Sequence, residues 1–265
     1  MLRLGLPSLL ILVLLCAGVA RAQDMTQYLD LKSDDFTKAE MTRAEVEEKL
    51  KAIPSGETLD LSGKRLNGVD LSGLDLRRVK FWATRLNGAN LRRANLDGVY
   101  LDQAWALKAD FTGASLRGAS LFGSQLMGAI LDGVDLERAR VVADLSRASL
   151  IGAQLKGADF SADMKNQSMG LMRGVLTKAN LAGANLDGAN LSHSALEHAS
   201  LKGASLKNAN LSGAELAVAD LTGADVSGAD FRGADLDSVT LKDLKGESSA
   251  NFSQARNMDR AIGRP

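Results

Sequence analysis

The chain has 265 residues, of which 45% are hydrophobic and only 4% aromatic, and its 32 basic side chains balance its 32 acidic ones. This balance excludes a strongly basic nucleic-acid binder and a strongly acidic mimic of nucleic acid. With so few aromatic side chains, a core must be filled mainly by leucine and alanine, which indicates a narrow interior.

The first 22 residues have the composition of a cleaved secretory signal peptide. A basic residue, Arg3, precedes an apolar run over 9–15, and Ala20-Arg21-Ala22 fits an A-x-A cleavage site. We expect cleavage near Ala22-Gln23 and an extracytoplasmic mature protein, periplasmic or secreted. An uncleaved membrane anchor is the alternative.

Loss of residues 1–22 would change the chemistry of the chain in two ways. The only cysteine, Cys16, leaves with the signal, so neither a disulfide nor thiol chemistry is expected in the mature protein. Arg3 and Arg21 leave and no acidic residue does, so 30 basic side chains remain against 32 acidic ones. A mature chain this close to neutral lacks the charge of a nucleic-acid partner.

Residues 23–58 form an N-terminal segment with one clear helix signal. Thr42 and Glu45 match a capping box, after which apolar residues recur at helical spacing up to Pro54. This pattern predicts a short capping helix over about 43–52. An alternative is open for 29–41, because three apolar residues there are five apart, so this stretch could be a degenerate copy of the repeat that follows: Leu31, Phe36 and Met41.

From residue 59 the sequence repeats every five residues. The stretch 180–191 reads NLAGANLDGANL, with leucine at 181, 186 and 191 and alanine two places before each. We call the large residue of each pentad its centre; Asp, Asn or Ser precedes most centres, and Gly often stands two places after them. The centres keep one phase over 61–141, resume one residue early over 145–160, and return to the first phase over 171–241.

A period of five fits neither a strand, with period two, nor an α-helix, with period 3.6. It fits a square coil in which each pentad is one side and four pentads make a turn of about 20 residues. The centre and the residue two before it then point inward, and the residues on either side of the centre point outward. Glycine supplies the positive φ of each corner. Stacked about 4.8 Å apart, about nine coils would make a rod roughly 40–45 Å long.

The recurring motif A-[DN]-L-x-G, over about residues 59–257, resembles the pentapeptide-repeat family. The resemblance implies an all-β fold, a right-handed quadrilateral β-helix solenoid. The short N-terminal capping helix predicted from the capping box would stand in front of it. A leucine-rich repeat is disfavoured, because its period is 20–29 residues with an asparagine signature.

The repeat is interrupted where its phase changes. One residue is missing between Val141 and Leu145, and one is in excess between Phe160 and Leu171, which predicts a loop over about 161–174. In an extracytoplasmic protein a methionine cluster can bind Cu(I), but methionine also fills irregular gaps, which is the favoured interpretation. The loop contains three methionines: Met164, Met169 and Met172.

One corner of the coil lacks glycine, and we expect its backbone to avoid positive φ. Its members are 20 residues apart: Lys178, His198, Val218 and Ser238. The two histidines, His193 and His198, would lie on successive corners, so shared metal binding is not expected.

Residues 258–265 are expected to form a C-terminal lid or tail. A β-helix exposes unpaired backbone at both ends and needs a cap. Met258, Ala261 and Ile262 would provide the apolar part of this lid.

The sequence contains no recognisable catalytic constellation. Only two histidines are present, and most acidic residues within the repeat occupy an outward position directly before or after a centre. No glycine run stands in the strand-to-helix context of a phosphate-binding loop. We expect no enzyme activity, no catalytic residue, no cofactor and no metal, no nucleic-acid partner, and no stable membrane span after signal cleavage.

Exposed aromatic residues provide the one candidate site. Four of them occupy outward positions, and stacking of the coils would bring them together across one corner, near several arginines and Lys80. Contiguous exposed apolar patches usually mark contact surfaces. The alternatives are that segment 24–41 packs over the patch, or that the patch has no role. We predict a protein-binding surface made of six residues: Trp82, Tyr100, Trp105, Leu107, Phe122 and Met127.

These observations favour a non-enzymatic, extracytoplasmic bacterial scaffold that binds another protein through this patch. The resemblance supplies a second hypothesis, because some members of the family mimic DNA and inhibit gyrase, a topoisomerase. The predicted signal peptide and the near-neutral charge disfavour it. A secreted effector that acts on a host is the third hypothesis.

Overall fold

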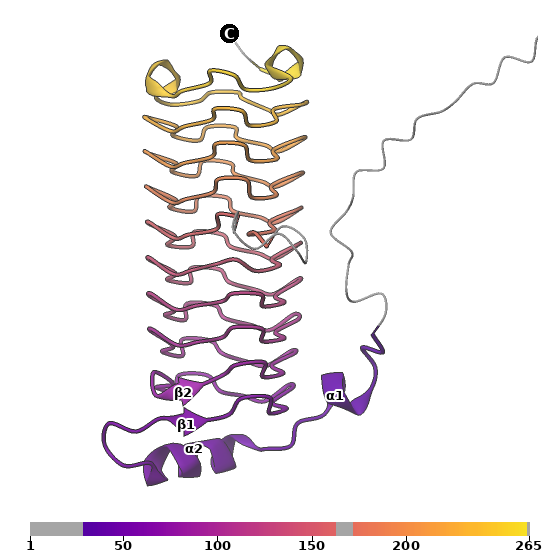
Figure 1. Cartoon of the computed structure of the whole chain (residues 1–265), viewed down its shortest axis with the longest axis vertical. Coiled ribbons are helices and arrows are strands. Elements are labelled where there is room, and N and C mark those ends of the chain that lie inside the picture. Colours follow the sequence, from indigo (N-terminus) through magenta and orange to yellow (C-terminus); the bar gives the residue numbers. More distant parts are fainter. Residues whose placement is uncertain (1–28, 163–171, 264–265) are drawn as a thin grey trace, which may run out of the picture.

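The structure is a computed structural model that describes residues 29–162 and 172–263. The predicted signal peptide and its cleavage site lie outside these residues. Between its short helical ends the chain winds through a stack of similar coils (Figure 1). Its elements are α1 (Asp34–Thr37), α2 (Arg43–Ala52), β1 (Leu59–Asp60), β2 (Val79–Lys80) and the 3-10 helices η2 (Glu247–Ser249) and η3 (Met258–Arg260).

Successive coils are joined by short parallel pairings rather than by long strands. β1 pairs with β2, and single bridges join positions 20 apart in the following pentads, as in Arg65 with Arg85 and Asp70 with Asn90. Because the paired positions are four pentads apart, four pentads complete a turn. We number the sides of the coil first to fourth by their centres in the first turn: Leu61, Leu66, Leu71 and Leu76.

The interior is filled by the centres and by the small residues two places before them. Leu186 and Leu191 are fully buried, as is Ala189 between them. Each buried leucine stabilises the fold by roughly 1.5–3 kcal/mol before conformational entropy is counted. Because nearly every pentad repeats this arrangement, the core is one continuous column along the rod.

The corners adopt a left-handed backbone whether or not glycine is present. Gly183 and Gly223 have φ of 65° and 69°. The prediction that the glycine-free corner avoids positive φ is wrong, because its residues have φ between 57° and 63°: Lys178, His198, Val218 and Ser238. The backbone hydrogen bonds between coils, which we call the ladder, hold the two sides that flank each corner. The corner residue must therefore adopt the positive φ that joins these sides.

Val218→Gly is expected to raise the free energy of unfolding by about 1 kcal/mol. A left-handed conformation costs an L-residue about 1–2 kcal/mol, and more for a β-branched one, whereas glycine loses only about 0.5–1 kcal/mol of backbone entropy. Val218 has φ 63° and a largely exposed side chain, so little packing is lost. The matched control is Ala217→Gly, at a position without positive φ, which should destabilise. Urea unfolding that ranks the two variants equally would contradict this explanation.

The coils stay paired where the phase of the repeat changes. Asp144 pairs with Gln125 in the preceding coil and with Val175 in the following one, so the side centred on Leu145 keeps its place. Leu171, predicted as a centre, lies outside the described residues, as does most of the predicted loop. In the ladder the side of Leu176 follows that of Phe160 directly.

The helix α2 lies across the first coil (Figure 1). Its N-terminus has a capping box, in which the Thr42 side chain accepts a hydrogen bond from the Glu45 amide and the Thr42 amide donates to the Glu45 carboxylate at 2.7 Å. Val46 is fully buried and belongs to the core cluster, and Leu50 packs against that cluster. This amphipathic packing covers the open edge of the first coil.

The other end of the rod is closed by η2, η3 and the chain between them. Phe252 stacks on Phe231, with ring centroids 4.7 Å apart and an interplanar angle of 13°. Met258 and Ala261 pack against the core, whereas Ile262 remains largely exposed. Within the described ranges, no helix has the length and apolar character that crossing a membrane requires.

Candidate interaction surface

Two aromatic side chains on the first side of the rod are open to solvent. Trp82 follows the centre Phe81, and Tyr100 precedes the centre Leu101 in the next coil. Since the centres point inward, both neighbours point outward. The exposed fraction is 52% for Trp82 and 64% for Tyr100. These two rings are therefore available for contact as the structure stands.

Charged and aromatic side chains surround Trp82 and Tyr100. Phe122 lies one coil beyond Asp102 in the column of Trp82, as the backbone hydrogen bonds of this side show. It is half-buried beneath Arg140, whose guanidinium carbon is 4.8 Å from the ring centroid. Such a cation–π contact contributes about 0.5–1 kcal/mol at an exposed site. We call five residues the aromatic face: Lys80, Trp82, Tyr100, Phe122 and Arg140.

Trp105 belongs to the second side and is covered by the N-terminal segment. Phe36 of α1 meets it edge-on, with ring centroids 5.2 Å apart and an interplanar angle of 79°. Leu107 and Met127, on the same side, are half-buried, as is Trp105. The six-residue patch predicted from the sequence is therefore divided at a corner. On the first side Trp82 and Tyr100 are exposed. On the second side Trp105 is covered by Phe36.

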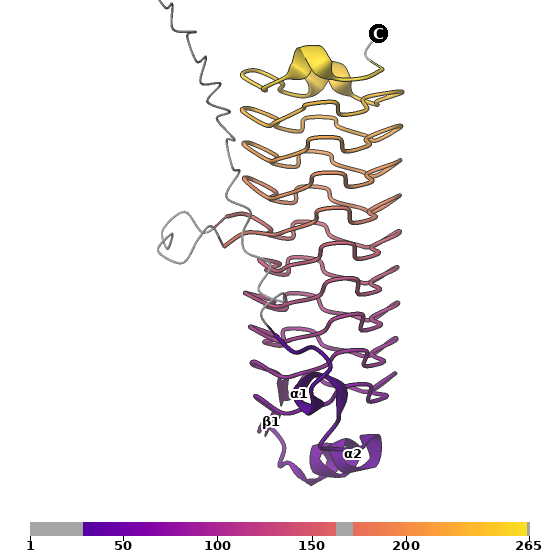
Figure 2. The ribbon, with the colours of Figure 1, turned by 90° about the vertical axis from the view of Figure 1, so that its right-hand side faces the viewer.

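We call residues 29–41 the strap, because they run along the side of the first coils (Figure 2). Ala39 forms an antiparallel bridge with Leu66, and the Glu40 amide donates to the Arg65 carbonyl at 2.9 Å. The alternative that 29–41 is a degenerate coil is wrong, since the strap forms α1 and this single bridge instead.

Two asparagines of the second side hold the strap by its backbone. The Asn67 side-chain amide donates to the carbonyl oxygens of Asp35 and Lys38, at 3.0 Å each. The Asn87 amide donates to the Phe36 carbonyl at 3.4 Å and to the Asn67 side-chain oxygen at 3.0 Å. Because they bind carbonyl groups, these contacts are independent of the strap's side chains.

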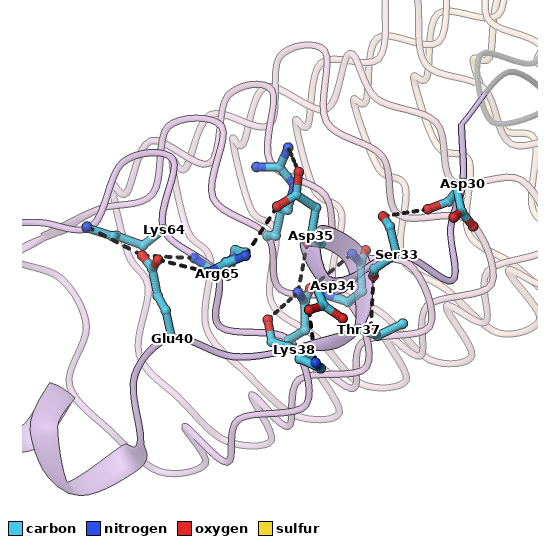
Figure 3. A network of polar contacts seen from close by, with 12 residues as sticks. Asp30, Ser33, Asp34, Asp35, Thr37, Lys38, Glu40, Lys64 and Arg65 are labelled. Carbon is cyan, nitrogen blue, oxygen red and sulfur yellow. Dashed lines mark hydrogen bonds and ion pairs between the residues drawn. The ribbon is translucent and has the colours of Figure 1, made fainter.

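Ion pairs join the acidic strap to basic residues of the first coils (Figure 3). Asp35 lies 3.3 Å from Arg65 Nη1 and 3.9 Å from Arg85 Nη2, and Glu40 lies 3.4 Å from Lys64 Nζ. None of these is a short two-bond pair, and Arg85 Nε is buried without a hydrogen-bond partner among the described residues. Exposed ion pairs of this kind contribute about 0–1 kcal/mol each.

The strap is held weakly in comparison with the coils. The edge-on aromatic pair is worth about 0.5–1.5 kcal/mol and each amide hydrogen bond about 0.5–1.5 kcal/mol. Ordering about a dozen residues costs roughly 1–2 kcal/mol per residue. No residue of α1 is fully buried, and no side chain caps its N-terminus. We therefore expect the strap to open locally, well before the rod unfolds.

A second polar cluster lies farther along the second side. Arg173 donates to both oxygens of Glu215, at 2.8 and 2.7 Å, and lowers the pKa of that carboxyl. Burial raises the pKa of the neighbouring Glu197, to which Glu215 is hydrogen-bonded, and Thr177 donates to Glu197 at 3.2 Å. The cluster therefore joins Arg173, just before the side of Leu176, to Glu215 two coils farther along the rod.

Glu197→Gln is expected to raise the unfolding temperature at pH 7 and to have little effect below pH 4.5. A glutamate whose folded pKa is raised stabilises the fold fully below its ordinary pKa of 4.5, and that stability is lost as pH rises through the folded value. Glutamine stays neutral and can keep the hydrogen bond to Glu215. Glu215→Gln is the control with the opposite sign, because its lowered pKa stabilises above 4.5. Thermal unfolding curves that shift equally at both pH values would contradict the assignment.

The described residues contain no group of three or more His, Cys, Asp or Glu side chains arranged to hold a metal ion. His193 and His198 are exposed corner residues. Met164 and Met169 of the predicted loop lie outside the described residues. The end of the Met172 side chain lies beside Gly123.

Sequence reasoning missed the contacts that decide which part of the patch is open. It used Phe36 only for its five-residue spacing, and did not foresee its contact with Trp105 and with the Arg85 guanidinium, whose carbon lies 5.4 Å from the Phe36 centroid. One signal was present, because the strap has four acidic and two basic residues, whereas basic residues cluster at positions 64, 65 and 85. The Arg173–Glu215 pair had no comparable signal.

A family model described as pentapeptide repeats matches the chain in eight copies. The matches cover residues 59–93, 75–106, 94–133, 107–141, 143–162, 175–213 and 199–237. Together they span more than half of the chain. Among curated proteins, none matches the chain.

Several solved structures are similar to this chain. HetL of the cyanobacterium Nostoc sp., described as a pentapeptide repeat protein involved in heterocyst differentiation regulation, is 29% identical, with 84% of this chain and 97% of HetL covered and a TM-score of 0.42. QnrB1, a plasmid-mediated fluoroquinolone resistance protein, is 18% identical over 76% of this chain and 92% of its own, with a TM-score of 0.43. A pentapeptide repeat protein of the Arabidopsis thaliana thylakoid lumen is 27% identical over 63% and 68%, with a TM-score of 0.16.

Proposed function

The chain belongs to the pentapeptide-repeat family, and from that premise we propose that it is a non-enzymatic, extracytoplasmic scaffold that binds another protein through the aromatic face. In this proposal the rod is a right-handed quadrilateral β-helix capped by α2. It provides a flat and rigid support for binding rather than a catalytic centre. Residues 1–22 deliver it out of the cytoplasm and are removed near Ala22-Gln23.

The observation that carries the proposal is the exposure of Trp82 and Tyr100 on adjacent coils of one flat side. Trp and Tyr bury large areas on contact and are enriched among the residues that dominate binding energy. Both stand on backbone held by ladder hydrogen bonds, so little backbone entropy is lost when a partner binds. The geometry favours this smaller surface over the six-residue patch.

The charges on the aromatic face add a preference for an acidic partner surface. Lys80 and Arg140 are both exposed and lie in the same column as Tyr100. Charges at the edge of an interface mainly increase the association rate and fix the orientation of the partner. We therefore expect the interaction to weaken as salt is raised.

The proposal is tested by affinity capture with the mature chain from the extracytoplasmic fraction of the native host. Trp82→Ser combined with Tyr100→Ser should lose a protein that the wild type retains. The control is Ile130→Ser combined with Ile151→Ser, which removes two exposed isoleucines of the third side and should retain it. Equal capture by all three chains, with equal unfolding temperatures, would refute the proposal.

The competing hypothesis of a gyrase inhibitor has a separate test. Inhibition of DNA supercoiling by the purified mature chain at micromolar concentration, together with recovery of the protein from the cytoplasm, would replace our proposal. We expect neither result, because the chain begins with a signal-like segment and its charge is near neutral.

A further inference from the structure

The surface beneath the strap has the composition of a peptide-binding site. It offers an aromatic ring, two arginines that lie near a carboxylate, and two side-chain amides directed at backbone carbonyls. Ala39 of the strap pairs antiparallel with Leu66 at the outer backbone edge of the first coil. We call five residues the strap-binding surface: Arg65, Asn67, Arg85, Asn87 and Trp105.

We propose that this surface is a recognition site for a short acidic peptide with an aromatic residue directly after its acidic residue, and that the strap occupies the site in cis. The strap sequence Asp35-Phe36 is the template for that ligand. Its carboxylate lies toward Arg65 and Arg85, and its ring lies against Trp105. An external peptide of this kind and the strap would compete for the same contacts, so the strap acts as an internal inhibitor of peptide binding.

The strap fills this site imperfectly, which leaves room for a better ligand. Asp35 stays 3.9 Å from Arg85 Nη2, and Arg85 Nε has no hydrogen-bond partner among the described residues although it is buried. Leaving a buried donor unsatisfied is costly, and a two-bond arginine–carboxylate pair is the geometry that removes the cost. A glutamate at the position of Asp35 carries one more methylene and extends the reach of the carboxylate toward Arg85.

We expect the site to bind the backbone of any peptide but to select two of its side chains. Asn67 and Asn87 bind carbonyl oxygens, which every peptide supplies. Charge complementarity selects an acidic segment, because Lys64, Arg65 and Arg85 form the basic side of the contact. Trp105 selects the aromatic residue.

The test uses fluorescent peptides copied from residues 31–40 and the whole mature chain. A strap tethered in cis competes at an effective concentration of about 1 mM, so it is first weakened by Phe36→Ala in the chain. We expect the Phe36→Ala chain to bind the Asp35→Glu peptide at least ~10-fold more tightly than the wild-type chain does. The peptide with Asp35 unchanged should bind less tightly, and the peptide with alanine at position 36 should not bind.

Controls separate this site from the aromatic face and from exchange between copies. Trp105→Ala added to Phe36→Ala should abolish peptide binding, whereas Trp82→Ser with Tyr100→Ser should leave it unchanged. Circular dichroism of each variant confirms that the coils are intact. Binding that persists without Trp105, or no binding to the Phe36→Ala chain at millimolar peptide, would overturn the proposal. So would a dimer of the wild-type chain that the peptide does not dissociate, because the strap of a second copy would then occupy the site.

Discussion

Leu186→Ala is expected to lower the free energy of unfolding by about 2–5 kcal/mol and to leave the surface unchanged. Leu186 is a fully buried centre in the middle of the rod, and its neighbours in the coils above and below are centres of the same column. The ladder hydrogen bonds of residues 185 and 186 hold the backbone in place, so the coil cannot collapse around the cavity. The lost contacts are therefore not recovered.

The measurement for Leu186→Ala is urea unfolding followed by amide hydrogen exchange. In a solenoid each coil contacts only its neighbours, so the loss of protection should be greatest in the coils next to residue 186 and should fade toward the ends. Lys156→Ala is the control, since Lys156 is an exposed outward residue next to the centre Leu155, and its effect should stay within about 0.5 kcal/mol. A loss below about 1 kcal/mol for Leu186→Ala would contradict a tightly filled interior.

Val46→Asp is expected to release α2 from the end of the rod and to make the protein associate. Val46 is the one fully buried residue of α2, and an unpaired carboxylate in its place would cost about 3–5 kcal/mol. Because undocking the helix is less costly than burying the charge, the helix should detach. The open edge of the first coil, including β1, would then be free to pair with another chain.

Light scattering at increasing protein concentration measures the association, and amide exchange at Leu61 and Leu66, whose N–H groups donate to Lys80 and Arg85, reports whether the first coil stays paired with the second. Glu48→Ala is the matched control, because Glu48 is an exposed residue of the same helix. It should change neither measurement. A Val46→Asp chain that stays monomeric with unchanged exchange at these amides would show that α2 is not what protects the first coil.

The repetitive part of the fold could be read from the sequence because one physical rule governs each pentad. A large inward centre, a small inward residue and a tight corner recur along the chain, and the inward positions are buried as the period requires. The positive φ at Val218 was not predicted, because the prediction considered only the local backbone preference of a residue other than glycine. The backbone hydrogen bonds between coils outweigh that preference.

The candidate site was less predictable because it depends on contacts between distant segments. Repeat geometry placed Trp82 and Tyr100 on an outward face, where both are exposed. It could not show that Phe36, nearly 70 residues away from Trp105 in sequence, would dock on it, because the strap follows no period. The partly buried pair of Arg173 and Glu215 likewise joins residues 42 apart in sequence, and Arg173 lies outside the regular pattern of the repeat.

Site-specific photocrosslinking in the native host tests the aromatic face most directly. A photoreactive amino acid is placed at position 100, next to Trp82 on the first side, or at position 156 on the fourth side as the control. We expect one discrete adduct from position 100 in the extracytoplasmic fraction, and none from position 156. The same adduct from both positions, or an adduct from position 156 alone, would contradict it.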